Sequence, residues 1–525
     1  MQRILSSIKH FNRKYYLDYL AIFVLAIIFF SQLQGTFTLP EPDSFYHAKI
    51  TEYLSQGKIL HQFPWLQETG LKDAFVDQHF LFHLLSIPFV VFEDPLVGVK
   101  MAVIFFTSLA IVTIYWFLKK FNVRWPFLYI LVLLLSPGWL FRLSIVKAPM
   151  VFLIFLLLAY YFLTKKRRLD LFLIAFFSVW LYGGWPMMLA LPFIYLSAFK
   201  FKQIIQAESF KAKLKSIFKL RGSGLPWFGI TSVSGGVLAG LIINPYFPAN
   251  LKFFKTIIYD IAIVNYHEVV RVGGEWYPYG IIQFITGNPL LCSLLAVSVL
   301  LLVINYKKAP THALVWGVFS VVALIFTLKS RRNIEYFIPF TLIFFAFSFQ
   351  NYLNGLSLLR PAERIVKKWH SPLAIILLVF LFSFLFTLPN NLLSIKKSML
   401  SGLPIDYLKE GAAWLKENTP KDSVIFNSDW DIFPPLFYYN DHNYYLTGLD
   451  HTLMYKKNQT KFLLYEKIIS GEEIEDLDLK IKENFNARYV FVQQGKVKFD
   501  ENLSTNNHFE KVFEDKYAKI YKIVD

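Results

Sequence analysis

Long runs of apolar residues recur along this chain, and short clusters of Lys and Arg separate them. A helix of about 17–25 apolar residues is long enough to cross the hydrocarbon core of a bilayer, so the runs predict a polytopic α-helical membrane protein with about eleven spans. We expect these spans at 17–38, 96–118, 125–141, 149–163, 169–183, 185–199, 226–247, 284–305, 310–328, 333–350 and 371–388.

The basic clusters alternate with the spans, and this alternation predicts sidedness, because cytoplasmic loops carry an excess of Lys and Arg. The densest clusters are the N-terminal segment 1–14, the KKRR run at 165–168 and the loops 200–222 and 357–370. With these clusters inside, the N-terminus lies in the cytoplasm and the C-terminus outside the plasma membrane. The apolar segment 79–92 is too short to span, so we expect an interfacial helix there.

The segment after the last span has a different pattern, which predicts a separate outer domain. Helical periodicity at 406–418 is followed by runs rich in β-branched and aromatic residues, which are typical of strands. We therefore expect a transmembrane domain at 1–388, with interfacial helices in the outer loop 39–94, and an extracytoplasmic α/β domain at 389–525. The expected strands are 423–429, 443–450, 487–493 and 518–524.

The composition agrees with this division and narrows the function classes. The chain of 525 residues is 55% hydrophobic and has a net charge of +17. From residue 389 onward there are 18 Lys and Arg against 21 Asp and Glu, whereas the preceding residues hold 36 and 16. The basic excess belongs to the membrane part, where it orients helices and meets anionic lipid, so we expect a lipid bilayer and no nucleic acid as partner. Because the chain has a single cysteine, Cys292, a disulfide framework within it is excluded.

Two adjacent arginines stand on the predicted outer face, the side that positive charge avoids. Arg331 and Arg332 lie in KSRRNIEYFIPF (329–340), at the mouth of a span. Arginine is the usual bidentate ligand of phosphate, so the pair predicts a site for a phosphate group. The alternative is a pair of structural bridges to carboxylates such as Glu335 or Glu268.

The short outer loop SPGWLFRLSIVKAPM (136–150) adds two further cations, Arg142 and Lys147. Either side chain is long enough to reach a phosphate at the membrane surface. Long basic side chains also extend to the interface without any ligand, and the sequence leaves these two interpretations open.

An acidic pair, Glu41 and Asp43, follows the first span and opens a predicted amphipathic helix. Oxygen ligands at this close spacing suit Mg²⁺ or Mn²⁺, and a partly desolvated carboxylate suits a general base. A favourable interaction with the helix N-terminus is the alternative. Asp77 and His79, farther along the loop, fit either a metal or acceptor site or a solvated helix start. The additional candidates in the outer loops are His47, Asp77, His79, Glu268 and Glu275.

In the C-terminal segment, FNSDWDIFPPLFYYND (426–441) places Asp429, Trp430 and Asp431 at the end of a predicted strand. Such a position suits acceptor binding. A turn capped by Asp and packed with Trp has the same pattern.

Together these motifs resemble the GT-C superfamily, the integral-membrane glycosyltransferases that use sugars linked to polyprenyl phosphate. The likeness is greatest to oligosaccharyltransferase catalytic subunits and their bacterial and archaeal relatives. EPDSFYH (41–47) is similar to the first acidic motif, which implies that Asp43 is the key carboxylate. SRRNIEYFIPF (330–340) is similar to the arginine-bearing span that faces the lipid phosphate. SDWDIFPPLF (428–437) is similar, loosely, to the Trp-Trp-Asp motif that recognises acceptor peptides.

The chain departs from this pattern at its acidic and acceptor motifs, and 248–280 has no clear third acidic motif unless Glu268 or Glu275 serves. The loop before the fourth span reads LSIVKAPM (143–150), with Lys147 where the second acidic motif has an acid. Asp429 replaces the first Trp of the acceptor motif. These departures argue against a divalent metal, for which Asp43 would be the ligand, and against an asparagine acceptor.

The resemblance implies an inverting glycosyltransferase that moves a sugar or glycan from a polyprenyl-phosphate-type carrier. The acceptor would be a protein, lipid or glycan on the outer face of the membrane. A transporter or flippase for lipid-linked glycans and a non-catalytic homologue are the alternatives.

Overall fold

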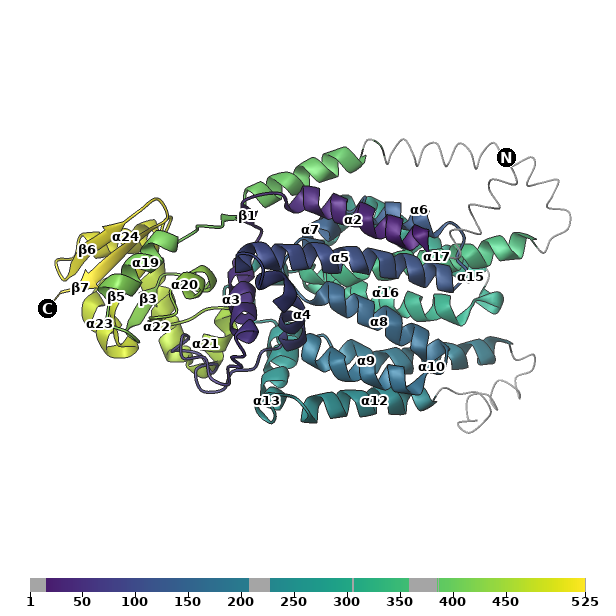
Figure 1. Cartoon of the computed structure of the whole chain (residues 1–525), viewed down its shortest axis with the longest axis horizontal. Coiled ribbons are helices and arrows are strands. Elements are labelled where there is room, and N and C mark those ends of the chain that lie inside the picture. The colour runs from purple at the N-terminus through teal and green to yellow at the C-terminus, as the bar shows by residue number, and fades with distance from the viewer. Residues whose placement is uncertain (1–15, 207–226, 305, 358–384, 386, 525) are drawn as a thin grey trace.

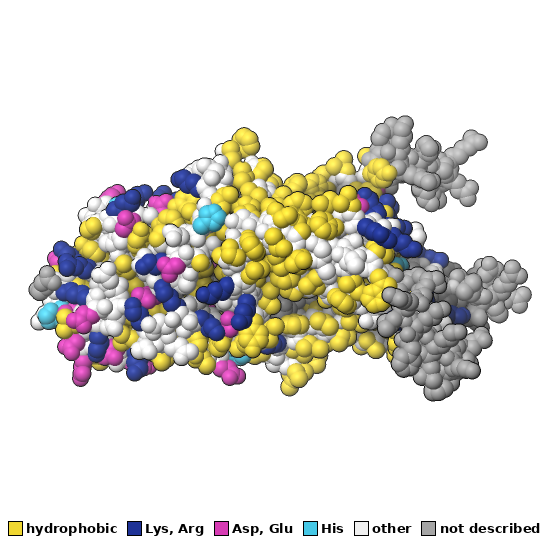
Figure 2. Space-filling model, turned by 90° about the horizontal axis from the view of Figure 1, so that it is seen from below, with side chains coloured by type: hydrophobic (Ala, Val, Ile, Leu, Met, Phe, Trp, Pro, Cys, Tyr) yellow, Lys and Arg dark blue, Asp and Glu magenta, His cyan; other side chains and the backbone are white. Residues whose placement is uncertain are grey.

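The computed structural model describes residues 16–206, 227–304, 306–357, 385 and 387–524. Figure 1 shows a bundle of long helices with a sheet-containing C-terminal domain at one end of it. In Figure 2 a broad hydrophobic surface covers the bundle, while Lys, Arg, Asp and Glu gather on the C-terminal domain. The bundle therefore has a surface suited to lipid, and the C-terminal domain one suited to water.

In the described part of the chain, five helices of the bundle are long and apolar enough to cross a membrane. Two further pairs pass the same test but are bent, by 88° and 95°. Each bend falls where a proline begins the second helix, because proline lacks an N–H and disfavours helical geometry in the preceding residue. The long helices are α2 (Leu17–Gln34), α5 (Pro95–Lys120), α10 (Pro186–Gln206), α16 (Thr311–Lys329) and α17 (Ile334–Ser357) with the turn before it; the bent pairs are α6 (Pro126–Leu133) with α7 (Pro137–Leu143), and α14 (Ile281–Gly287) with α15 (Pro289–Ile304).

The expected count of eleven spans is not confirmed, because the described residues hold five such helices, or seven if each bent pair is one span. Three expected spans form helices of only 14 or 16 residues: α8 (Pro149–Thr164), α9 (Arg168–Leu181) and α12 (Trp227–Ile242). Most of the expected span 371–388 lies outside the described residues. Which side of a membrane each end faces stays a prediction.

Glycines bring two of these shorter helices into close contact. A Cβ on Gly236 would lie 2.3 Å from the carbonyl oxygen of Phe172, and one on Gly240 would lie 2.5 Å from that of Phe176. The backbones of α12 and α9 therefore touch, as at the small-residue interfaces by which membrane helices associate.

The loop after α2 folds over the end of the bundle that faces the C-terminal domain (Figure 1). It contains β1 (Thr38–Leu39), α3 (Asp43–Ser55) and α4 (Phe80–Val90). The 11 residues of α4 make it too short to span a bilayer, in agreement with the expected short helix at 79–92. β1 pairs antiparallel with β2 (Leu403–Pro404), so this loop is tied to the C-terminal domain.

The C-terminal domain has the expected α/β architecture, with a mixed five-stranded sheet in the order β4-β3-β5-β7-β6. β3 runs parallel to β4 and β5, whereas β7 runs antiparallel to β5 and β6. Four strands fall within the expected segments, but β6 was not predicted. The strands are β3 (Val424–Asn427), β4 (Tyr444–Tyr445), β5 (Ala487–Gln493), β6 (Phe509–Glu514) and β7 (Ala518–Ile523); the helices are α19 (Lys409–Asn418), α20 (Phe433–Tyr439), α21 (His451–Lys457), α22 (Gln459–Ser470), α23 (Leu477–Phe485) and α24 (Val497–Ser504).

Several short elements remain between α12 and α17, and those near the C-terminal domain position charged side chains described below. The short elements are α13 (Ala249–Lys255), the π-helix η1 (Thr256–Val264) and the 3₁₀ turns η2 (Gly274–Trp276), η3 (Tyr306–Lys308) and η4 (Arg331–Asn333).

Candidate functional site

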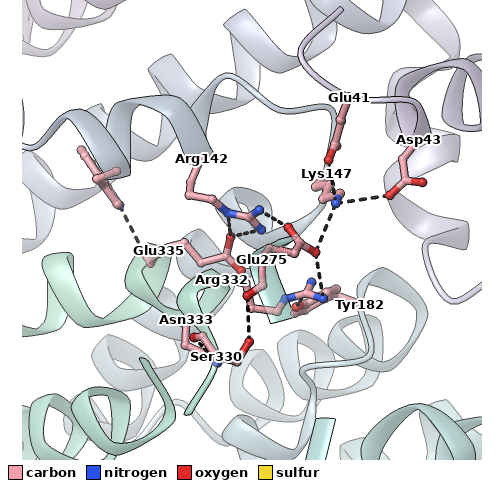
Figure 3. Close-up of polar contacts among 11 residues, drawn as sticks. Glu41, Asp43, Arg142, Lys147, Tyr182, Glu275, Ser330, Arg332, Asn333 and Glu335 are labelled. Atoms are coloured by element: carbon pink, nitrogen blue, oxygen red, sulfur yellow. Dashed lines mark hydrogen bonds and ion pairs between the residues drawn. The ribbon is translucent and has the colours of Figure 1, made fainter. Parts of the chain in front are cut away.

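Charged side chains from four distant segments meet at the end of the bundle that faces the C-terminal domain (Figure 3). The segments are the start of α3, the stretch from α7 to α8, the turn η2, and η4 with the start of α17. We call this set the ion cluster. Its members are Glu41, Asp43, Arg142, Lys147, Glu275, Arg332 and Glu335.

Lys147 is the cation at one end of the ion cluster. Its Nζ lies 2.8 Å from Glu41 Oε2, 3.2 Å from Asp43 Oδ2 and 3.5 Å from Glu275 Oε1. Burial alone would lower the pKa of Lys147, but these carboxylates raise it, so the ammonium keeps its charge. Burial raises the pKa of Glu41, whose second carboxylate oxygen is buried with no hydrogen-bond partner among the residues that the structure describes.

Glu275 joins the two ends of the ion cluster. Its carboxylate pairs with Arg142, with Lys147 and, at 3.3 Å, with Arg332. Burial opposes ionisation, yet the three cations hold the pKa of Glu275 well below its usual range. No pattern in the sequence favoured Glu275 over its neighbours, and Glu268 from the same loop is exposed.

Arg142 and Glu335 form the other end of the ion cluster. Arg142 Nε and Nη2 both donate to Glu335 Oε2, at 3.0 and 2.9 Å, and the third contact of the guanidinium is with Glu275. Glu335 is only 1% exposed. The sequence offered Glu335 as a bridging partner for Arg331 or Arg332. Glu335 does form an ion pair, but its partner is Arg142.

The adjacent arginines have different environments. Arg332 lies 4.3 Å over the ring of Trp276 and donates to the Tyr182 hydroxyl at 3.4 Å. Arg331 instead donates to the backbone carbonyl of Pro278 at 3.2 Å and lies 5.3 Å from the ring of Tyr279. Only Arg332 joins the carboxylates of the ion cluster.

The ion cluster borders a cavity of about 460 Å³, whose lining includes Asp43, Lys147, Glu275 and Arg332 but neither Arg331 nor Arg142. Away from these charges the lining becomes apolar. That part is formed by residues of α10, η1, α16 and α17, among them Met187, Ile194, Ile257, Phe319, Phe326 and Phe340. The cavity therefore combines a charged wall with an apolar compartment between helices.

The rings of three histidines, His47, His79 and His83, lie with their centroids 5.0–6.2 Å apart. His47 Nδ1 is 2.7 Å from His83 Nε2, and His83 Nδ1 is 2.7 Å from Asp77 Oδ2. His47, His83 and Asp77 are all buried. His79 stacks on Tyr182 with ring centroids 5.8 Å apart. His47 and His79 line the cavity. His83 was not predicted, because it lies within the apolar segment 79–92, where the other long side chains of the helix are hydrophobic.

The candidate acceptor residues lie at the end of β3. Asp429 pairs with Lys496 at 2.8 Å and with Arg271 at 3.1 Å. Trp430 is buried, and its indole nitrogen has no hydrogen-bond partner within the described residues. Burial, together with the Asp429 and Asp43 carboxylates, raises the pKa of Asp431 to about 7. The domain that carries this strand end also borders the cavity, through Leu449, Asp450 and Leu453.

The side chains around Asp43 do not fit the ligand set of a divalent metal. Within the described residues no three His, Cys, Asp or Glu side chains are arranged to hold an ion. The ammonium of Lys147 already lies between Glu41, Asp43 and Glu275, where a cation would otherwise neutralise them.

Solved structures with the same fold exist, although no sequence-family profile and no curated protein matches this chain. The oligosaccharyltransferase AglB from Archaeoglobus fulgidus, in complex with an inhibitory peptide and a dolichol-phosphate, aligns with a TM-score of 0.63 and 13% identity over 92% of this chain and 70% of that one. ArnT from Cupriavidus metallidurans, bound to undecaprenyl phosphate, aligns with a TM-score of 0.54 and 13% identity over 97% and 98%.

The arabinofuranosyltransferase AftD from Mycobacteria aligns with a TM-score of 0.52 and 12% identity, over 97% of this chain and 40% of that one. All three proteins are GT-C glycosyltransferases. The chain therefore has the GT-C fold, and the resemblance inferred from its motifs is confirmed at the level of fold.

Proposed function

We propose that this chain is a membrane glycosyltransferase that moves a sugar or glycan from a polyprenyl-phosphate-type carrier to an acceptor. The observation that carries the proposal is the cavity, which joins cationic side chains to an apolar compartment. A lipid phosphate has the matching shape: an anionic headgroup for Arg332 and Lys147, and an isoprenoid chain for the space between α10, α16 and α17. The solved structures of AglB and ArnT hold such lipids.

In this proposal the cations stabilise the leaving group. As the bond between the anomeric carbon and the phosphate oxygen breaks, its electron pair passes to the phosphate. Fixed positive charges in a site shielded from water stabilise that developing charge more strongly than water does. Arg332 and Lys147 line the cavity and supply them. Lys147 takes over part of the role that a metal would have, so the reaction needs no Mg²⁺ or Mn²⁺.

Asp43 acts on the acceptor in the same cavity. Its carboxylate orients or deprotonates an acceptor hydroxyl or amide that attacks the anomeric carbon from the face opposite the phosphate, which inverts the configuration. The acceptor is held from the other side by the loop 265–280 and by Trp430 and Asp431. With the protein in the plasma membrane and its N-terminus in the cytoplasm, transfer takes place at the outer face, below the domain 389–525.

The test is transfer by the full chain in lipid nanodiscs, with a panel of radiolabelled sugars on undecaprenyl phosphate as donors. Formation of a labelled product, or release of undecaprenyl phosphate by slow transfer to water, is expected with at least one donor. Turnover should be unchanged in EDTA. Movement of the donors from one leaflet of a vesicle membrane to the other, without cleavage of the bond between sugar and phosphate, would instead establish a flippase.

A non-catalytic homologue is the second candidate, and one observation favours it. Lys147 engages both carboxylates of the first acidic motif, Glu41 and Asp43. Binding of undecaprenyl phosphate without cleavage of any donor in the panel, and without translocation, would establish this alternative.

A further inference from the structure

The geometry of the hydrogen-bonded chain Asp77–His83–His47 determines which nitrogen donates each hydrogen bond. A carboxylate only accepts hydrogen bonds, so the proton between Asp77 Oδ2 and His83 Nδ1 belongs to His83. In a neutral imidazole the other nitrogen is then an acceptor, so His83 Nε2 accepts from His47 Nδ1–H. His47 Nε2 is therefore left with its lone pair free.

This lone pair belongs to a residue that lines the cavity, on the same helix as Asp43. Positions 43 and 47 are four apart in α3 and so lie on one face of the helix. Both residues border the cavity. His47 Nε2 accepts no hydrogen bond from any described residue, whereas Asp43 is already engaged by Lys147 at 3.2 Å.

We propose, resting on the function proposed above, that His47 is the proton acceptor of the transfer reaction and that His83 and Asp77 are its positioning residues. The acceptor O–H or N–H, oriented by Asp43, gives its proton to His47 Nε2. The acceptor atom bonds to the anomeric carbon, and the bond from that carbon to the phosphate oxygen breaks with its electron pair on the phosphate. The positive charge formed on His47 is stabilised by Asp77 through His83, and the proton later leaves with the product.

The surroundings of His47 agree with this role. Burial, His83, His79 and Lys147 all lower the pKa of His47, so the imidazole is neutral at rest and ready to accept a proton. Asp77 is the buried anion that compensates the charge when the proton arrives, at the far end of two hydrogen bonds of 2.7 Å. In hydrolytic triads a carboxylate likewise orients the imidazole that is the general base; here a second imidazole, His83, lies between the carboxylate and the base.

The first test compares His47→Gln with His61→Gln in the full chain in nanodiscs. The same substitution at His61, an exposed histidine of the same loop, is the matched control. We expect His47→Gln to lower kcat by about 100-fold or more, the usual contribution of a general base, while affinity for undecaprenyl phosphate is kept and the control is unchanged. Asp77→Asn should also lower kcat with donor affinity kept. Imidazole in the buffer should restore part of the activity of His47→Ala, which a merely structural role would not allow.

The second test does not need turnover. Solid-state NMR of the ¹⁵N-histidine-labelled protein, with the His47 signals identified by their loss in His47→Gln, should show Nδ1 protonated and Nε2 unprotonated. A proton on Nε2 at neutral pH overturns the proposal. An active wild-type protein whose His47→Gln variant keeps its kcat overturns the proton-acceptor role alone. A wild-type protein that neither binds undecaprenyl phosphate nor cleaves any donor overturns the proposed function together with this inference.

Discussion

The two ends of the ion cluster contain the same kinds of ion pair but have different surroundings. At one end Arg142 and Glu335 are buried on α7 and α17, and neither residue lines the cavity. At the other end Lys147, Asp43 and Arg332 border the cavity. Ion pairing by itself therefore does not separate structural charges from reactive ones. What separates them is whether a ligand can reach the pair. Glu275 links the two ends, because it pairs with Arg142 at one and with Lys147 at the other.

If the cavity end is the reactive one, Asp43→Asn should have the largest effect on activity. The amide keeps the size of the carboxylate but loses its charge, so it no longer orients the acceptor O–H or N–H toward His47. We expect glycosyl transfer to fall by about 10²-fold or more, with the protein still folded in the membrane. Transfer assays and gel filtration in detergent measure both quantities. Turnover near the wild-type level would remove Asp43 from the mechanism.

If the end with Arg142 and Glu335 is structural, Arg142→Ala should act on stability. The substitution leaves Glu335 buried without its partner, which costs about 3–5 kcal/mol in measured buried pairs. Thermal unfolding in detergent should show a lower Tm, and Arg142→Lys should recover only part of it because a single ammonium cannot form the forked contact. A folded, stable Arg142→Ala protein with weak lipid binding would reverse the two roles and support the phosphate contact first expected for Arg142.

The neighbours Arg331 and Arg332 allow the same comparison between adjacent positions, because only the second of them lines the cavity. Arg332→Ala should weaken binding of undecaprenyl phosphate by about 10- to 100-fold, the equivalent of one charged hydrogen bond. Arg331→Ala is the matched control, and we expect a change of less than about threefold, because its guanidinium contacts Pro278 and Tyr279 instead of the cavity. Fluorescence titration or native mass spectrometry gives the affinities. Equal losses in both variants would return the phosphate role to Arg331 as well.

The smallest expected effect concerns Asp431 at the acceptor side. Because its pKa is raised to about 7 in the folded protein, the unfolded state loses this proton at lower pH than the folded state does. The residue therefore destabilises the fold progressively as pH rises from about 4 to 7. Asp431→Asn should raise Tm at pH 8 but not at pH 4. An equal change in Tm at both values would contradict the shift.

Several elements were predictable because their signals are local. Apolar length identified most bundle helices, and β-branched and aromatic runs identified β3, β5 and β7. Bends at Pro137 and Pro289 could have been read as breaks in two expected spans, since proline punctuates helices. β6 was not predicted, because three of the six residues in FEKVFE (509–514) are Glu or Lys and its apolar residues do not alternate regularly with them.

The site was only partly predictable. The motif after the first span identified Glu41 and Asp43, and the outer cations were identified as a group. Their partners were not, because Arg142 and Glu335 are 193 positions apart and no local pattern relates them. The choice between Arg331 and Arg332 depends on the 3₁₀ turn η4, in which successive side chains point about 120° apart.

Local sequence determined which segments are apolar helices, where charge is placed between them, and that an α/β domain follows, because hydrophobic length and side-chain periodicity act over neighbouring residues. The tertiary structure alone decided which charges meet, which of them border a cavity, and that His47 is oriented by His83 and Asp77. Those outcomes depend on distances of a few ångströms between segments that are remote along the chain, and such distances are set only when the helices pack.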